Sequence, residues 1–369
     1  MKTVCETDKC TGCMACKDIC PHSAITIKDS LTSYNAVIDE KLCIGCGACE
    51  RVCQVKNPPE LKLPILWKQG WASDSEIRKK SSSGGAASVL EREFVRQGGY
   101  VCSCIFQQGR FVYQLENKPE DIERFAGSKY VKSDPSGIYK QVKEKLTQGN
   151  RVLFVGLPCH VAAVKKFVGN KWQEHLYTID LICHGTPSPQ ILTEYLQQHN
   201  TDIADIGNIG FRNNANFYLQ CDQKPVAVKN CLDKYSMGFL YSLFYTENCY
   251  ECHYANTQRV SDITLGDSWG SELSADEQAK GISLILCQTE KGKELLENSA
   301  LNLYEVDFAR AIANNHQLRA PSSRPPKRDY FFTRIQAGDK FDRIVRKCYP
   351  KSSQKQFIKG ILVKLKIKK

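Results

Sequence analysis

Long apolar runs are missing from the 369 residues of this chain. No stretch approaches the roughly 20 consecutive apolar residues that a membrane-spanning helix needs. A secretory leader is also missing, because the sequence runs from Met1 directly into the first cysteines. These absences predict a cytoplasmic protein. In a reducing cytoplasm, 19 cysteines are expected to serve metal and redox chemistry rather than disulfides.

Basic residues are in balance with acidic ones over most of the chain. The net charge is +11, but residues 319–369 hold 16 Lys and Arg against three Asp, which leaves −2 for the other 318 residues. A nucleic-acid partner is therefore not expected, because such partners are bound by a basic surface on the folded body. The G-K-[ST] sequence of a nucleotide-binding P-loop is also absent.

Two cysteine runs of identical spacing dominate the first 57 residues. Each run reads C-x2-C-x2-C-x3-C, the spacing of bacterial ferredoxins with two 4Fe-4S clusters, in which the fourth cysteine binds the cluster of the other run. One cluster is therefore predicted on Cys10, Cys13, Cys16 and Cys53. The second is predicted on Cys43, Cys46, Cys49 and Cys20.

Zinc sites and disulfide scaffolds are the alternatives for these runs. Zinc sites use two C-x2-C pairs rather than two runs of four cysteines, and disulfides need an oxidising compartment. The second run departs from the usual pattern, because Gln54 stands where proline commonly follows the last cysteine. The exit of that loop is therefore expected to be less rigid.

The rest of the chain predicts an α/β (α+β) fold in three parts. Three prolines within residues 57–64 indicate a stiff linker between a ferredoxin domain at 1–57 and a catalytic body at 65–318, which a basic tail at 319–369 follows. Predicted strands at 151–156 and 176–182 alternate with helices, which is typical of a mixed, mostly parallel sheet. Both strands end near a cysteine, at the edge where such sheets place their sites.

Four cysteines of the body predict a further metal site. Cys159 and Cys183 follow the two strands, and Cys249 and Cys252 form a C-x2-C pair. Four thiolates from three points of one domain suit a third 4Fe-4S cluster or a structural zinc ion. The redox-active surroundings favour the cluster.

A segment rich in serine and glycine predicts a phosphate-binding turn. Ser82, Ser83, Gly84 and Gly85 precede an amphipathic helix that is expected to end near residue 97. Such a helix begins with free backbone N–H groups, which bind phosphate. An ordinary helix N-cap is the alternative.

The blocks 156–160, 183–187, 248–252 and 262–270 together resemble a family made up of the beta subunits of coenzyme F-420-reducing hydrogenases and dehydrogenases. The resemblance covers nearly the whole chain in the order of the family, although His160 stands where glutamine is usual. It implies an FAD-containing body whose cluster is bound by the four body cysteines. It also implies flavin contacts from the following residues: Ser82, Ser83, Gly84, Gly85, Ser128, Lys129 and Tyr130.

These interpretations predict a cytoplasmic, flavin-dependent iron–sulfur oxidoreductase. Electrons from a low-potential donor protein such as ferredoxin are expected to enter at the N-terminal clusters, cross the third cluster and be paired on FAD for a small-molecule substrate. The alternative is an electron-transfer subunit that has no substrate of its own and docks on a separate catalytic partner.

The end of the chain predicts a basic amphipathic helix. Its apolar stripe comprises Phe357, Ile358, Ile361, Leu362 and Leu365. The flanking lysines are Lys355, Lys359, Lys364, Lys366, Lys368 and Lys369. Peripheral contact with the inner membrane face is one interpretation. The alternatives are a helix that packs its stripe on the body and a frayed, solvated tail.

Overall fold

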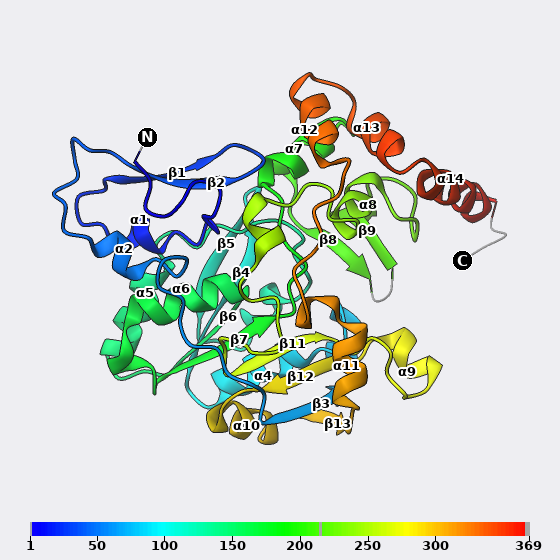
Figure 1. Ribbon diagram of the computed structural model, residues 1–369. Helices are drawn as coiled ribbons and strands as arrows, with labels where there is room; N and C mark the ends of the chain where they lie inside the picture. Colours follow the sequence, from blue (N-terminus) through cyan, green and yellow to red (C-terminus); the bar gives the residue numbers. More distant parts are fainter. Residues whose placement is uncertain (1, 214–215, 366–369) are drawn as a thin grey trace.

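A computed structural model describes residues 2–213 and 216–365 (Figure 1). The fold class agrees with the prediction: a small unit with two cysteine runs lies against an α/β body. Lys366, Lys368 and Lys369 of the predicted basic helix lie outside the described residues. Within the described ranges, no helix is both long and apolar enough to cross a membrane.

The N-terminal unit consists of two short helices and a hairpin. Its elements are α1 (Ala15–Ile19), β1 (Ile25–Asp29), β2 (Tyr34–Ile38) and α2 (Ala48–Val52), and β1 pairs with β2 in antiparallel fashion. Each helix follows a residue with positive φ, Met14 at 61° and Gly47 at 69°, which turns the loop sharply into the helix. The third cysteine of each run lies in its helix, and the fourth caps the helix C-terminus.

The body is built on an eight-stranded mixed sheet in the order β13-β3-β12-β11-β7-β6-β4-β5. Its four central strands are parallel, and the strands on both flanks are antiparallel. The strands are β3 (Leu66–Ala72), β4 (Tyr100–Gln107), β5 (Arg110–Glu116), β6 (Val152–Gly156), β7 (Leu176–Leu181), β11 (Ile263–Asp267), β12 (Ser283–Cys287) and β13 (Leu301–Tyr304). A smaller antiparallel sheet contains β8 (Ile209–Asn213), β9 (Asn216–Cys221) and β10 (Lys224–Pro225).

Helices cover both faces of the large sheet, with α5 and α6 packed on one face and α4 and α10 on the other. The helices of the body are α3 (Ser75–Lys80), α4 (Ala86–Arg96), α5 (Ile138–Thr147), α6 (Pro158–Val168), α7 (Pro189–Gln197), α8 (Lys234–Leu240), α9 (Ala275–Lys280), α10 (Glu290–Glu297), α11 (Phe308–Asn314), α12 (Arg328–Gln336), α13 (Phe341–Cys348) and α14 (Pro350–Lys364). Of these, α8 and α12 to α14 lie beside the smaller sheet (Figure 1). Short 3-10 turns include η1 (Ile122–Phe125) and η4 (Glu247–Glu251). Along β6, Val152 and Phe154 pack in the core with α5 and α6, whereas Leu153 and Val155 pack in the core with α4 and α10. The alternation follows the two-residue period of a strand that is buried on both faces.

The N-terminal unit and the body share one hydrophobic core. Residues of α1 and β2 belong to the same buried cluster as residues of α5 and α6. Polar contacts close the junction: both carboxylate oxygens of Asp18 accept from the backbone N–H of Gly137 at 2.8 Å, and the Nζ of Lys132 donates to the carbonyl of Thr11 at 2.9 Å. The two units are therefore packed together as one body.

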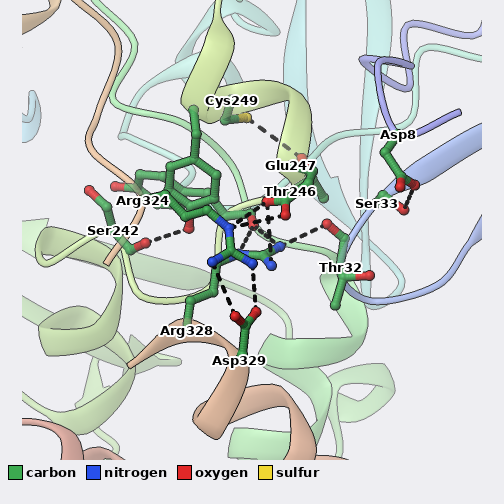
Figure 2. A network of polar contacts seen from close by, with 12 residues as sticks. Asp8, Thr32, Ser33, Ser242, Thr246, Glu247, Cys249, Arg324, Arg328 and Asp329 are labelled. Atoms are coloured by element: carbon green, nitrogen blue, oxygen red, sulfur yellow. Dashed lines mark hydrogen bonds and ion pairs between the residues drawn. The ribbon is translucent and has the colours of Figure 1, made fainter. Parts of the chain in front are cut away.

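A buried arginine joins three distant segments (Figure 2). The guanidinium of Arg328, at the start of α12, donates to the carbonyls of Thr32 and Tyr245, both at 2.9 Å. It also lies 3.4 Å from a carboxylate oxygen of Glu247, the first residue of η4. Because Thr32 is in the β1–β2 turn and Cys249 is in η4, this one side chain fixes the N-terminal unit relative to a predicted ligand of the body cluster.

Replacing Arg328 with methionine is expected to destabilise the protein by about 3 kcal/mol, because the buried carbonyls and Glu247 lose their partner. Arg324→Met is the matched control: Arg324 also contacts Glu247, but its side chain is 40% exposed against 2% for Arg328. The control should cost about 1 kcal/mol or less. Urea unfolding of the two variants measures the difference, and equal losses would contradict the role of Arg328.

Candidate functional site

The cysteines of the predicted second cluster lie at the surface of the N-terminal unit. Cys46 is exposed, and Cys20, Cys43 and Cys49 are half-buried. Two large apolar side chains beside them face solvent, since Leu42 is 49% exposed and Ile44 is 67% exposed. This end of the molecule therefore combines an accessible cysteine set with an apolar rim.

The cysteines of the predicted first cluster surround a small cavity inside the same unit. Cys10, Cys13, Cys16 and Cys53 line it together with Cys5. The neighbouring Cys5 thiol lowers the pKa of Cys53 to about 6, despite the burial of Cys53. These four thiols are the donor set that the predicted 4Fe-4S cluster needs at its corners.

The four body cysteines meet at the carboxyl edge of the sheet. Cys159 lies in the first turn of α6, directly after β6, and Cys183 follows β7. Burial, with a smaller contribution from neighbouring Cys249 and Cys252, raises the pKa of Cys183 to about 12. The sulfur of Cys249 accepts a hydrogen bond from the backbone N–H of Thr186 at 3.4 Å.

Burial also raises the pKa of Cys159 and Cys252, so binding these thiols as thiolates requires a positively charged centre, which an iron–sulfur cluster or a metal supplies. Over the described parts of the chain, no group of three or more His, Cys, Asp or Glu side chains is arranged to hold a single metal ion. Cys159 also interacts electrostatically with Cys13 of the inner N-terminal set. The inner set and the body set are therefore neighbours.

His160 next to Cys159 is fully buried. Its Nδ1 lies 2.9 Å from the hydroxyl of Tyr113, and burial lowers its pKa to about 3. Among the described residues, its Nε2 has no hydrogen-bond partner. The imidazole is therefore neutral, and it lies between Cys159, a predicted cluster ligand, and Tyr113. Tyr113 also lines a large cavity of the body.

A cavity of about 480 Å³ lies beside Cys183 of the body set. Its wall includes Cys183 and both segments that the sequence predicts to contact flavin. The predicted cofactor residues that line it are Ser82, Ser83, Gly85, Ser128, Lys129 and Tyr130. The two segments are bonded to each other, because the backbone N–H of Ser128 donates to Ser82 Oγ at 2.9 Å.

The N-terminus of α4 points its first turn at this cavity. Gly85 precedes the helix with φ of 87°, and no side chain of the described residues caps it. Ala86, Ala87 and Ser88 of the first turn line the cavity. The predicted bare helix N-terminus is thus present, and its orphan N–H groups with the positive end of the helix dipole suit an anionic group such as a pyrophosphate.

Gly84 serves packing rather than the cavity wall. A Cβ built on Gly84 would lie 2.3 Å from the carbonyl oxygen of Gly70 in β3 and 2.7 Å from the backbone nitrogen of Ser283 in β12. Only glycine allows the segment to lie this close to the sheet. The close approach at Gly84 therefore fixes the distance between the start of α4 and strands β3 and β12.

Charged and aromatic residues complete the cavity wall, and the sequence analysis did not identify Glu91, Arg212 or Phe239 among them. Burial raises the pKa of Glu91, on the inner face of α4, to about 8. Arg212 forms a bidentate pair with Asp267, with N–O distances of 2.6 and 2.9 Å. Tyr130 stacks on Phe239 with ring centroids 4.4 Å apart. These pairs join β8 to β11 and the 127–133 loop to α8, so only the folded chain brings them together.

Comparison with family models accounts for most of the chain. Residues 9–57 match a 4Fe-4S dicluster domain. Residues 68–138 match the N-terminal part, and residues 149–307 the C-terminal part, of the coenzyme F420 hydrogenase/dehydrogenase beta subunit. The two parts together cover more than half of the chain, and they include the cavity segments and all four body cysteines.

One curated relative is a component of the F(420)H(2) dehydrogenase of Methanosarcina mazei, and it is 26% identical over 216 residues. The match covers 54% of this chain and 62% of that relative. A chain in a solved structure of the F420-reducing [NiFe] hydrogenase complex from Methanosarcina barkeri is 19% identical, with a TM-score of 0.49 over 70% of this chain and 91% of that one. The cysteine runs, the cavity segments and the matched models agree with the predicted resemblance: the chain belongs to the family of coenzyme F420 hydrogenase/dehydrogenase beta subunits and carries an N-terminal 4Fe-4S dicluster domain.

Proposed function

We propose that this protein is an electron-transfer subunit that connects a donor protein at its surface to a flavin in its large cavity. The observation that carries the proposal is the order of the cysteine sets. The set around Cys46 is accessible, the set around Cys13 is buried, and the body set that contains Cys159 and Cys183 ends at the cavity wall. Twelve predicted ligands thus form a path from solvent to cavity.

The cavity supports FAD as its occupant. It offers the bare N-terminus of α4 for a pyrophosphate and an aromatic wall at Tyr130 for a ring system. With clusters and FAD bound, the protein would convert between one-electron transfer through the clusters and two-electron transfer at the flavin. Glu91 is predominantly protonated near neutral pH because its pKa is raised, so it supplies a neutral hydrogen-bond donor in the wall.

The ammonium group of Lys129 is held in place by two backbone carbonyls. Its Nζ donates to Phe125 at 2.6 Å and to Ala126 at 3.1 Å, and burial lowers its pKa. A cation fixed in this way contributes positive charge to the wall without side-chain motion. The residue suits an anionic or electron-rich ligand, as the predicted flavin contact requires.

An electron-donor protein such as ferredoxin suits the exposed end. Leu42 and Ile44 form an apolar rim beside the accessible cysteine set, and small apolar patches beside a redox centre are suitable docking points for transient partners. Because the curated relative is named as a subunit of a dehydrogenase, we expect a separate catalytic partner as well.

A second candidate function is reduction of a small molecule by this chain alone. The observation in its favour is Trp269, a cavity-lining residue that is 41% exposed and therefore gives a ligand an aromatic contact at the rim. Anaerobic purification without partners, followed by turnover assays with reduced ferredoxin, separates the two functions. Two-electron reduction of an added small molecule would favour the enzyme.

The cluster assignment predicts about twelve irons per chain, four for each cluster. Cys159→Ala should lower the iron content by about four while the electron paramagnetic resonance signals of the dicluster domain remain. Cys287→Ala is the control. Cys287 is buried in a strand and belongs to no ligand motif, so this variant should keep all its iron. Loss of no iron, or of all iron, in the Cys159 variant would contradict the body cluster. One equivalent of zinc would favour a structural zinc site.

The flavin assignment predicts that Gly85→Val releases the cofactor while the clusters stay filled. The Cβ would face Ser81 and Ala72, and valine would strain the left-handed backbone at φ of 87°, so the α4 N-terminus should move. Gly98→Val is the matched control. Gly98 follows the other end of the same helix with a similar φ of 80°, but a Cβ there would meet open space, so this variant should keep its flavin. Acid-released flavin is the measurement. Normal flavin content in the Gly85 variant would mean that this loop does not hold the cofactor.

The donor surface predicts that Ile44→Glu slows reduction by reduced ferredoxin about tenfold, the effect of losing one apolar anchor. Leu63→Glu is the control, since Leu63 is similarly exposed, at 58%, but lies in the linker. Anaerobic stopped-flow absorbance measures the rate. If both variants slow the reaction equally, the docking site lies elsewhere.

A further inference from the structure

The last two helices of the chain present opposite sides to the body. Helix α13 buries its apolar residues Phe341, Ile344, Val345 and Cys348. Helix α14, two residues later, buries only Ser353 and Gly360 among its described residues. Amphipathic helices of soluble domains normally turn their apolar face to the core, as α13 does. Helix α14 therefore has the reverse orientation.

Polar contacts fix this orientation of α14. The backbone N–H of Leu232 donates to Gln356 Oε1 at 3.1 Å, and Ser352 Oγ lies 3.0 Å from the hydroxyl of Tyr241. The Nζ of Lys359 donates to the carbonyl of Asn230. These side chains attach the polar side of α14 to the segment that follows β10 and to the end of α8.

The apolar stripe of α14 consequently faces solvent. Phe357 is 69% exposed, Ile358 50%, Ile361 44% and Leu365 63%. The sequence positions i, i+1, i+4 and i+8 fall on one side of a helix. The stripe is therefore not packed on the body, which was one of the alternatives for this segment. Leu362, which the sequence places in the stripe, is half-buried.

Positive charge borders the stripe. Lys351, Lys355 and Lys364 of α14 are exposed, and no acidic residue occurs from Lys351 to the end of the chain. Helix α13 adds three exposed basic residues: Arg343, Arg346 and Lys347. An occupant that covers this surface must accept apolar side chains at its centre and cations around them. The acyl chains and headgroups of an anionic lipid bilayer have both properties.

We propose that α14 is a peripheral membrane anchor that lies in the plane of an anionic lipid surface. Phe357, Ile361 and Leu365 enter the acyl region, and the lysines contact the headgroups. Helix α14 and the N-terminal unit lie at opposite sides of the molecule (Figure 1). A protein anchored through α14 therefore keeps its accessible cysteine set away from the bilayer.

The test is flotation of the full-length protein with vesicles of phosphatidylcholine, with and without phosphatidylglycerol. The wild type should partition at least about tenfold more strongly onto the anionic vesicles, and high salt should weaken the binding. The Phe357→Ser/Ile361→Ser variant should lose binding at both salt concentrations. Its folding should be unaffected, since both residues are exposed, and urea unfolding checks this.

Two outcomes would overturn the proposal. The first is equal flotation of the wild type and the double variant on anionic vesicles at low salt. The second is absence of vesicle binding together with a change in sedimentation mass between wild type and variant, which would assign the stripe to contact with a second copy of the chain. Leu63→Ser, a loss of an exposed apolar side chain elsewhere, is the control and should float like the wild type.

Discussion

The buried ammonium group of Lys132 lies where the N-terminal unit, the body and two of the predicted cysteine sets meet. Its Nζ donates to the carbonyl of Thr11 in the first cysteine run and lies 5.2 Å from the ring centre of Tyr34. Its charge favours the ionised form of Cys10 in one half and of Cys159 in the other. A buried cation is costly without compensating charge, so thiolates at the two predicted cysteine sets and docking of the N-terminal unit would stabilise each other.

Local features of the site were predictable from the sequence. The cysteine runs have a spacing that only a few structures use, and the serine–glycine segment before α4 indicated a bare helix N-terminus, which the structure contains. The strand before Cys159 is an apolar run of strand length, and the strand before Cys183 is mostly apolar. In each case the signal lies within about ten neighbouring residues, where spacing and turn chemistry determine the structure.

The rest of the site could not be predicted, because it depends on contacts between distant segments. Arg212 and Asp267 are 55 residues apart, and the raised pKa of Glu91 follows from burial that its amphipathic helix does not reveal. The structure of residues 319–369 also depends on distant contacts that the sequence does not reveal. Their composition suggested a basic tail, yet Phe331 and Phe341 are fully buried in a core that includes residues of α7 and α8. The stripe of α14 was visible in the sequence, but the side it turns to the body was not.

The core shared by the N-terminal unit and the body has a consequence for the speed of electron transfer. Domains joined only by a flexible linker can carry a redox centre back and forth, so that the rate follows the motion of the domain. Here Asp18, Lys132 and Arg328 hold the N-terminal unit against the body at three separate points. The distances between the predicted redox centres of the two parts are therefore fixed by the fold. Since tunnelling falls off steeply with distance, the packing of this junction would set the electronic coupling between the dicluster domain and the redox centre proposed for the body.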